Sequence, residues 1–181
     1  MESPQAVCKS GIEFLSLIEA LDLKAAAERN AVSGLFDEAI GLTQRISDVA
    51  IKSLSYAKIA EIMTYPHLQN LPRARVVVAL AHGIAQSLAD EELRDLLLSR
   101  TARVMADAQD FSNACAGAEE IQVVFIRSLC LISIANRLVD IHNFSEARVV
   151  ARKVHDIAGQ ENCVENRAIL LKEVDKLIGR M

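Results

Sequence analysis

A short motif, an aromatic residue followed by two polar residues and then alanine, occurs three times in this chain of 181 residues. The copies begin at Phe36, Phe111 and Phe144, and a degenerate fourth copy begins at Leu71. These positions lie 35, 40 and 33 residues apart. Self-similarity at this period is typical of stacked helical pairs, so the repeat constrains the fold more than any single residue does. Such an array is predicted to bind something, but the sequence does not identify the ligand.

The composition favours an all-helical fold. Apolar residues make up 51% of the chain and aromatic residues only 4%, whereas a β-rich fold would need more aromatic and β-branched side chains. Only seven glycines and three prolines interrupt the chain, which predicts long helices with short connections. The apolar fraction is large enough to build a core, so disorder is not expected.

The charge balance disfavours a nucleic-acid partner. The formal net charge is −4, and neither half of the chain has the basic balance that nucleic-acid-binding domains usually have. No apolar run reaches the roughly 18 residues that a membrane span needs, and no signal-peptide pattern is apparent. We therefore expect a cytoplasmic protein with no nucleic-acid and no membrane partner.

Apolar side chains recur every three or four residues after Asp48 and after Ile121, which predicts amphipathic helices. Asp48 and Asp90 are predicted to cap helix N-termini, and Pro72 suits a first helical turn. Gly34 is predicted to end the first long helix in the left-handed conformation. The expected helices cover residues 12–31, 35–47, 49–65, 72–89, 91–107, 111–122, 124–141, 144–158 and 162–178.

These helices predict an all-α fold, a right-handed α-solenoid of about four antiparallel helix pairs with a C-terminal capping helix. The expected repeats, within a single domain 1–181, are 12–47, 49–89, 91–122 and 124–158, with the cap at 162–178. The 40-residue interval predicts extra length around 87–93. Small side chains at equivalent positions would let neighbouring helix axes approach within about 8–10 Å. These are Ala27, Ala60, Ala102 and Ala135 on the longer helices, and Ala39, Ala74, Ala114 and Ala147 on the shorter ones.

Gly34, Phe36 and Ala39 together form a Gly-x-aromatic-x-x-Ala motif. This motif resembles the start of the second helix in repeats of the tetratricopeptide (TPR) family, which pairs two antiparallel helices in about 34 residues. The copies at Phe111 and Phe144 lack the glycine. The resemblance covers residues 12–158. The chain departs from the family pattern because the large aromatic residue early in the first helix and the closing proline are absent, and a HEAT-type array is the alternative.

The resemblance implies that the chain binds a peptide or protein along a concave groove lined by the first helix of each pair. By position, the groove would present Lys24, Glu28, Glu61, Tyr65, Ser99, Arg103, Asp107, Asn136 and Asp140. Leu21, Leu54, Leu96 and Leu129 would lie at its base or in the core. Glu28 and Glu61 stand where a site that clamps a carboxylate needs neutral side chains, so the tails of heat-shock chaperones are not expected as ligands.

No residue pattern typical of an enzyme or a metal site is present. The histidines lack the spacing of a helical metal site, and phosphate-binding loops and nucleophile elbows are absent. We therefore expect a non-enzymatic adaptor with no cofactor and no metal. The four cysteines form no close pair and are predicted to be buried free thiols: Cys8, Cys115, Cys130 and Cys163.

Two other functions and self-association stay open at this point. Several chaperones for secreted bacterial proteins are small, acidic TPR proteins, and this chain has a similar size and charge. An enzyme on a helical-repeat scaffold would need catalytic groups that converge from distant positions. Homo-oligomers would form if an uncovered terminal helix pairs with a second copy.

Overall fold

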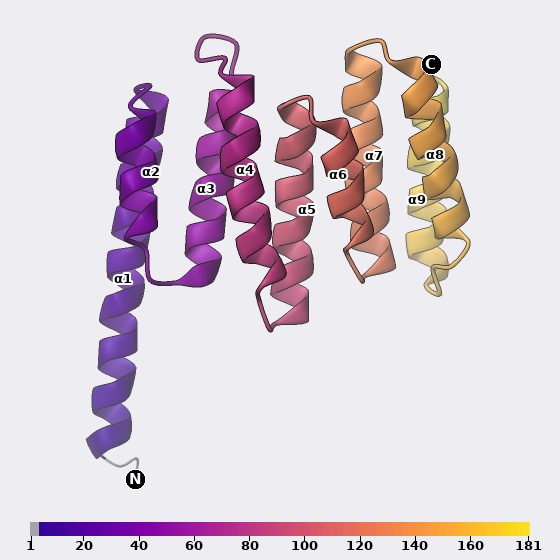
Figure 1. Ribbon diagram of the computed structural model, residues 1–181. Coiled ribbons are helices and arrows are strands. Elements are labelled where there is room, and N and C mark those ends of the chain that lie inside the picture. The colour runs from indigo at the N-terminus through magenta and orange to yellow at the C-terminus, as the bar shows by residue number, and fades with distance from the viewer. Residues whose placement is uncertain (1–3) are drawn as a thin grey trace. The chain divides into compact units, whose positions relative to one another are not determined.

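The computed structural model of the protein describes residues 4–181, with side chains from Leu15 onward. Over these residues the chain forms nine α-helices and no strand, which confirms the predicted all-α class (Figure 1). The helices are α1 (Pro4–Val32), α2 (Phe36–Gln44), α3 (Val49–Met63), α4 (Leu71–Gln86), α5 (Glu91–Asp107), α6 (Phe111–Glu119), α7 (Val124–Asp140), α8 (Phe144–Ala158) and α9 (Val164–Ile178).

The chain divides into two compact units, Met1–Leu88 and Ala89–Met181. In the first unit, α1 packs on α2 and α3, and α3 packs on α4. In the second unit, α7 packs on α5, α6, α8 and α9, and α8 also packs on α9. The boundary between the two units, after Leu88, lies within the segment 87–93 where the repeat interval predicted extra length. Part of that length is helical, because α4 has 16 residues where α2 and α6 have 9 each.

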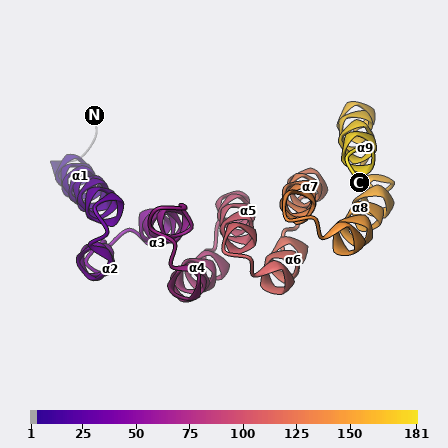
Figure 2. The ribbon, with the colours of Figure 1, turned by 90° about the horizontal axis from the view of Figure 1, so that it is seen from above.

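Each unit consists of two rows of helices (Figure 2). In the first unit α1 and α3 lie side by side, with α2 and α4 on one face of that pair. In the second unit α5, α7 and α9 form one row, and α6 and α8 form the other. We call α1, α3, α5, α7 and α9 the odd helices, and the others the even helices.

The turn that precedes each phenylalanine motif has the same backbone geometry. The residue two positions before the phenylalanine has a positive φ in all three copies: +79° at Gly34, +58° at Gln109 and +61° at His142. The N–H of the following residue bonds to the carbonyl five residues earlier, with N···O distances of 2.9, 2.9 and 2.8 Å for Leu35–Asn30, Asp110–Met105 and Asn143–Leu138. This is the Schellman arrangement of a helix end. It confirms the prediction for Gly34, and a glutamine and a histidine adopt the same conformation in the other copies.

The small residues of the repeat lie in the core. The alanines at the two equivalent positions are fully buried in every repeat: Ala27, Ala39, Ala60, Ala74, Ala102, Ala114, Ala135 and Ala147. A methyl side chain at these positions leaves room for the neighbouring helix, since helix axes pack about 8–10 Å apart. The motif residues Phe36, Phe111 and Phe144 are half-buried beside them.

Helix starts follow local sequence where a capping side chain is available. Asp48 Oδ1 accepts a hydrogen bond from Ile51 N at 2.8 Å, and Asp90 Oδ1 accepts one from Leu93 N at 2.9 Å. Both predicted caps are therefore confirmed. The predicted start of the first helix at residue 12 was wrong, because α1 begins at Pro4. Proline is well tolerated in a first helical turn, where its missing N–H costs no intrahelical bond.

Candidate functional site

Four odd helices carry a leucine six residues before their buried alanine. Although leucine is strongly apolar, these side chains are not in the core. Their exposed fractions are 49% for Leu21, 36% for Leu54, 56% for Leu96 and 39% for Leu129. Of the two positions expected for them, the structure therefore excludes the core. In each unit, two of these leucines lie on odd helices that pack against each other.

Charged residues on the odd helices of the first unit form short-range pairs. On α1, Lys24 Nζ lies 2.7 Å from Glu28 Oε1. On α3, Lys58 Nζ lies 2.9 Å from Glu61 Oε1, and the Tyr65 hydroxyl donates to the same oxygen at 3.4 Å. Four of the predicted groove residues thus belong to two partly exposed clusters, which follow the exposed Leu21 and Leu54 in the sequence.

In the second unit, a charge network joins three odd helices at their C-terminal ends. Arg137 on α7 places Nε 2.6 Å from Asp107 Oδ1 of α5 and Nη1 3.8 Å from Asp140 Oδ2. Arg180, just after α9, places Nη2 2.8 Å from the other oxygen of Asp140 and also donates to the side chain of Asn136. The structure therefore brings together three predicted groove residues, Asp107, Asn136 and Asp140.

The two arginines of this network were not among the predicted residues. Arg180 follows the last helix, 40 residues after Asp140, so no local spacing indicates their contact. A weak signal was present for Arg137, because a cation three residues before Asp140 is a common helical ion pair. The remaining predicted residues differ in accessibility. Arg103 is exposed, whereas Ser99 is only 6% exposed.

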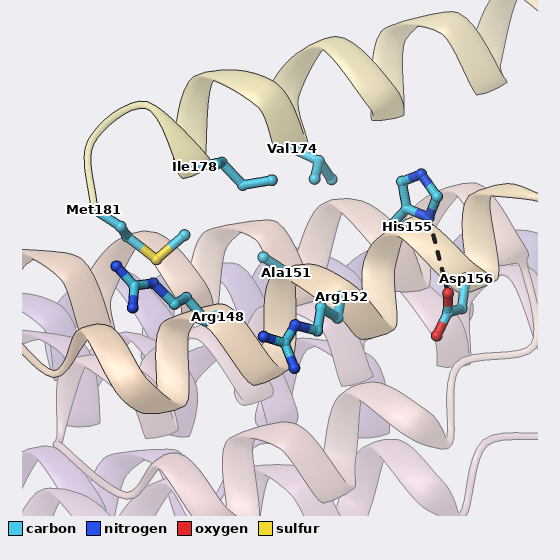
Figure 3. Close-up of a pocket in the computed structure, with 8 residues that line it drawn as sticks. All are labelled: Arg148, Ala151, Arg152, His155, Asp156, Val174, Ile178 and Met181. Atoms are coloured by element: carbon cyan, nitrogen blue, oxygen red, sulfur yellow. Dashed lines mark ion pairs between the residues drawn. The ribbon is translucent and has the colours of Figure 1, made fainter.

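A pocket of about 460 Å³ lies between α8 and α9. Figure 3 shows Val174 and Ile178 pointing from α9 toward α8, with Met181 beside Arg148 at one end. His155 Nδ1 lies 3.8 Å from Asp156 Oδ1 on the α8 side. The pocket is lined by Arg148, Ala151, Arg152, His155, Asp156, Val174, Ile178 and Met181. It thus combines an apolar floor with a basic rim, and sequence reasoning missed it.

The cysteine side chains lie in three different environments. Cys130 is buried, and this burial raises the pKa of its thiol to about 11. Cys115 is half-buried, and desolvation likewise raises its pKa, against the opposing charge of Lys153. Cys163 is exposed, so the prediction of buried thiols was wrong for this residue. It occupies the N-cap position of α9, outside the packed helix faces. Cys8 lies outside the described side chains.

From Leu15 onward, no group of three or more histidine, cysteine or acidic side chains is placed to hold a metal ion. None of the described helices is long and apolar enough to cross a lipid bilayer. No protein-family model, no curated protein and no solved structure matches the chain.

Proposed function

We propose that the chain is a non-enzymatic helical-repeat protein that binds a peptide or protein partner along a groove lined by its odd helices. In this proposal the helix pairs form a TPR-like, right-handed α-solenoid, and α9 caps the array. The support is the threefold repetition of one Schellman turn and the burial of alanine at two equivalent positions of every pair. A repeated supersecondary unit with small residues at its contacts is typical of such arrays.

The observation that carries the proposal is the exposed leucine at the same position of four odd helices. Scattered apolar residues on a surface need no explanation, but apolar side chains that recur on one face often belong to an interaction site. Partly exposed ion pairs and polar groups accompany these leucines on the same helices. An apolar centre with a polar rim is the usual composition of a protein-binding surface.

The test compares variants that remove leucines from the odd helices with matched variants on the even helices. Leu21→Ser with Leu54→Ser changes the first unit, and Leu96→Ser with Leu129→Ser changes the second. Val76→Ser and Val149→Ser, which replace exposed valines of α4 and α8, are the controls.

Each protein is used as bait in affinity purification from native cells, and the captured proteins are identified by mass spectrometry. We expect one partner to be retained by the unchanged protein and by both valine variants, and to be lost with the leucine variants. Because the leucine side chains are partly exposed, circular dichroism should report the same helix content for the unchanged protein and for every variant. The proposal would be contradicted if the leucine variants still captured the partner, or if the valine variants lost it.

A further inference from the structure

The pocket between α8 and α9 is separate from the exposed leucines of the odd helices. We propose that it is a second binding site, and that its ligand is an acidic amphipathic helix of a partner protein. The shape of the groove, the periodicity of its side chains and the charge of its rim all suit such a helix.

The groove is formed by two helices that pack directly against each other. Ala151 of α8 and Val174 of α9 are buried at its floor, whereas Ile178 is 55% exposed at its edge. Its volume of about 460 Å³ is within the range of ligand-binding clefts. A hydrophobic groove between two helices suits the apolar face of a third helix.

The side chains of the groove repeat with the period of a helix. Val174 and Ile178 are one turn apart on α9, and Arg148 and Arg152 are one turn apart on α8. Residues at positions i and i+4 lie on the same helix face, about 5–6 Å apart between their Cβ atoms. A partner helix with an apolar stripe and a neighbouring row of carboxylates at the same spacing would meet both sets of side chains.

The arginines on the rim are available for such carboxylates. Arg148 and Arg152 are both exposed, and neither forms an ion pair with another side chain from Leu15 onward. Lys153, which follows Arg152 on α8, is instead paired with Glu119 of α6. The one side-chain carboxylate among the residues that line the pocket, Asp156, lies next to His155. Guanidinium groups bind carboxylates with two parallel hydrogen bonds, which favours an acidic partner over a neutral one.

Polyanionic partners fit the pocket less well than an acidic helix. Among the described residues, no phenylalanine, tyrosine or tryptophan lines it, so His155 is the one aromatic ring that it offers for stacking with single-stranded bases. The formal charge of −4 on the chain opposes every anionic partner, but it opposes nucleic acids and anionic membranes most strongly, because they carry far more charge than a short helix with one row of carboxylates.

The probe is a fluorescein-labelled peptide of about four helical turns, with leucines on one face and a neighbouring row of glutamates one turn apart. Its binding to the full chain is followed by fluorescence anisotropy at physiological salt. We expect saturable binding, weakened about tenfold when Arg148→Gln and Arg152→Gln are combined, since two partly exposed charge pairs are lost. A peptide with glutamine in place of glutamate should lose a similar factor.

Lys172→Gln is the matched control, because Lys172 is an exposed cation of α9 that does not line the pocket. It should leave probe affinity unchanged within about twofold. Ile178→Asn removes apolar surface at the edge of the groove and should weaken binding without changing the charge. Equal binding by the double arginine variant, or no binding by the unchanged protein, would overturn the proposal.

Other occupants of the groove give different results in the same experiment. If a second copy of the chain fills it, sedimentation will show a dimer that the arginine substitutions dissociate. If the site recognises phosphate groups, then duplex DNA or anionic vesicles will displace the probe. A dimer of this kind, or such a displacement, overturns an acidic helix as the ligand. The odd-helix proposal is tested separately, because the combined Leu96→Ser and Leu129→Ser variant should bind the probe normally.

Discussion

The carboxylate of Asp95, on α5, accepts a hydrogen bond from the backbone N–H of Val123 at 2.8 Å and another from Gln122 at 2.9 Å. Val123 is the N-cap residue of α7, and it occupies the position of the capping aspartates Asp48 and Asp90 in the preceding odd helices. Asp95 therefore anchors the turn that enters α7, because it binds the N–H groups of the N-cap residue and of the residue before it. Asp48 and Asp90 instead bind the N–H group three residues after the N-cap, and α7 has no side-chain cap of that kind.

We predict that Asp95→Ala lowers the free energy of unfolding by about 1–3 kcal/mol, because two backbone N–H groups lose their charged acceptor. Val123→Asp should raise it by about 1 kcal/mol in either background, because its carboxylate would cap the N–H group three residues further on, which Asp95 does not bind. Urea denaturation of the four proteins measures the coupling between the two changes. A gain from Val123→Asp that occurs only in the Asp95→Ala background would show instead that the two carboxylates compete for the same N–H groups.

Two equivalent serines should respond in opposite ways to alanine. Ser53 is buried and donates to the carbonyl of Ala81 at 2.9 Å, whereas the buried hydroxyl of Ser128 has no hydrogen-bond partner among the residues from Leu15 onward. Ser53→Ala should lower the free energy of unfolding by about 1 kcal/mol because a buried hydrogen bond is lost. Ser128→Ala should leave it unchanged or raise it, because it removes an unsatisfied polar group. Chemical denaturation of the two variants provides the comparison, and a large loss at Ser128 would count against it.

The three Schellman turns predict a second pair of opposite effects. Gly34→Ala should destabilise the protein by about 1 kcal/mol, since a side chain in the left-handed conformation is strained. Gln109→Gly and His142→Gly should each raise the melting temperature, because glycine adopts this conformation without that strain. Thermal unfolding followed by circular dichroism tests all three. A lower melting temperature for both glycine variants would show that their side chains stabilise the turns in another way.

The close packing of α7 predicts that Ala135→Leu destabilises the second unit. Ala135 is fully buried, so three added carbon atoms must displace neighbouring side chains or backbone. Overpacking of this kind costs about 1–3 kcal/mol. Val149→Leu, at an exposed position of α8, is the control and should have little effect. An unchanged melting temperature for Ala135→Leu would disprove close helix contact at this residue.

Cys130 makes stability depend on pH in the alkaline range. Burial raises its pKa from 9.0 to about 11, so the thiol releases its proton more easily in the unfolded chain than in the folded one. Its contribution to stability is therefore complete below about pH 9 and is lost as the pH rises toward 11. In Cys130→Ala, the free energy of unfolding should fall less steeply over this range than in the unchanged protein. Equal slopes would show that the thiol does not titrate differently on folding.

Features set by local sequence were predictable. The sequence predicted a helix at each of the nine positions where the structure describes one from Pro4 onward, although α1 begins before its predicted start. Asp48 and Asp90 were identified as caps because a capping bond joins residues only three apart. The hydrogen bonds of Asp95 at the start of α7 were not predicted, since its partners lie 27 and 28 residues away. The contact between Arg180 and Asp140 was missed for the same reason.

The α8–α9 pocket could also not be predicted from the sequence, although the sequence indicates each of the two amphipathic helices that form it. Arg148 and Arg152 look like an ordinary solvated face of α8. They become the rim of a pocket only because Val174 and Ile178 pack opposite them. The spacing of residues within one helix does not specify which face its neighbour covers.

The sequence by itself determined where most of the helices lie, that Gly34 ends the first of them and where small side chains are needed, because these depend on steric and hydrogen-bonding constraints within a few residues. Only the tertiary structure decided that Leu21, Leu54, Leu96 and Leu129 stay partly exposed and that Asp95 is buried at the start of another helix. Burial and pairing depend on side chains that distant segments bring into contact. The same residue type at equivalent positions of two helices can therefore differ in its partners, as Ser53 and Ser128 do.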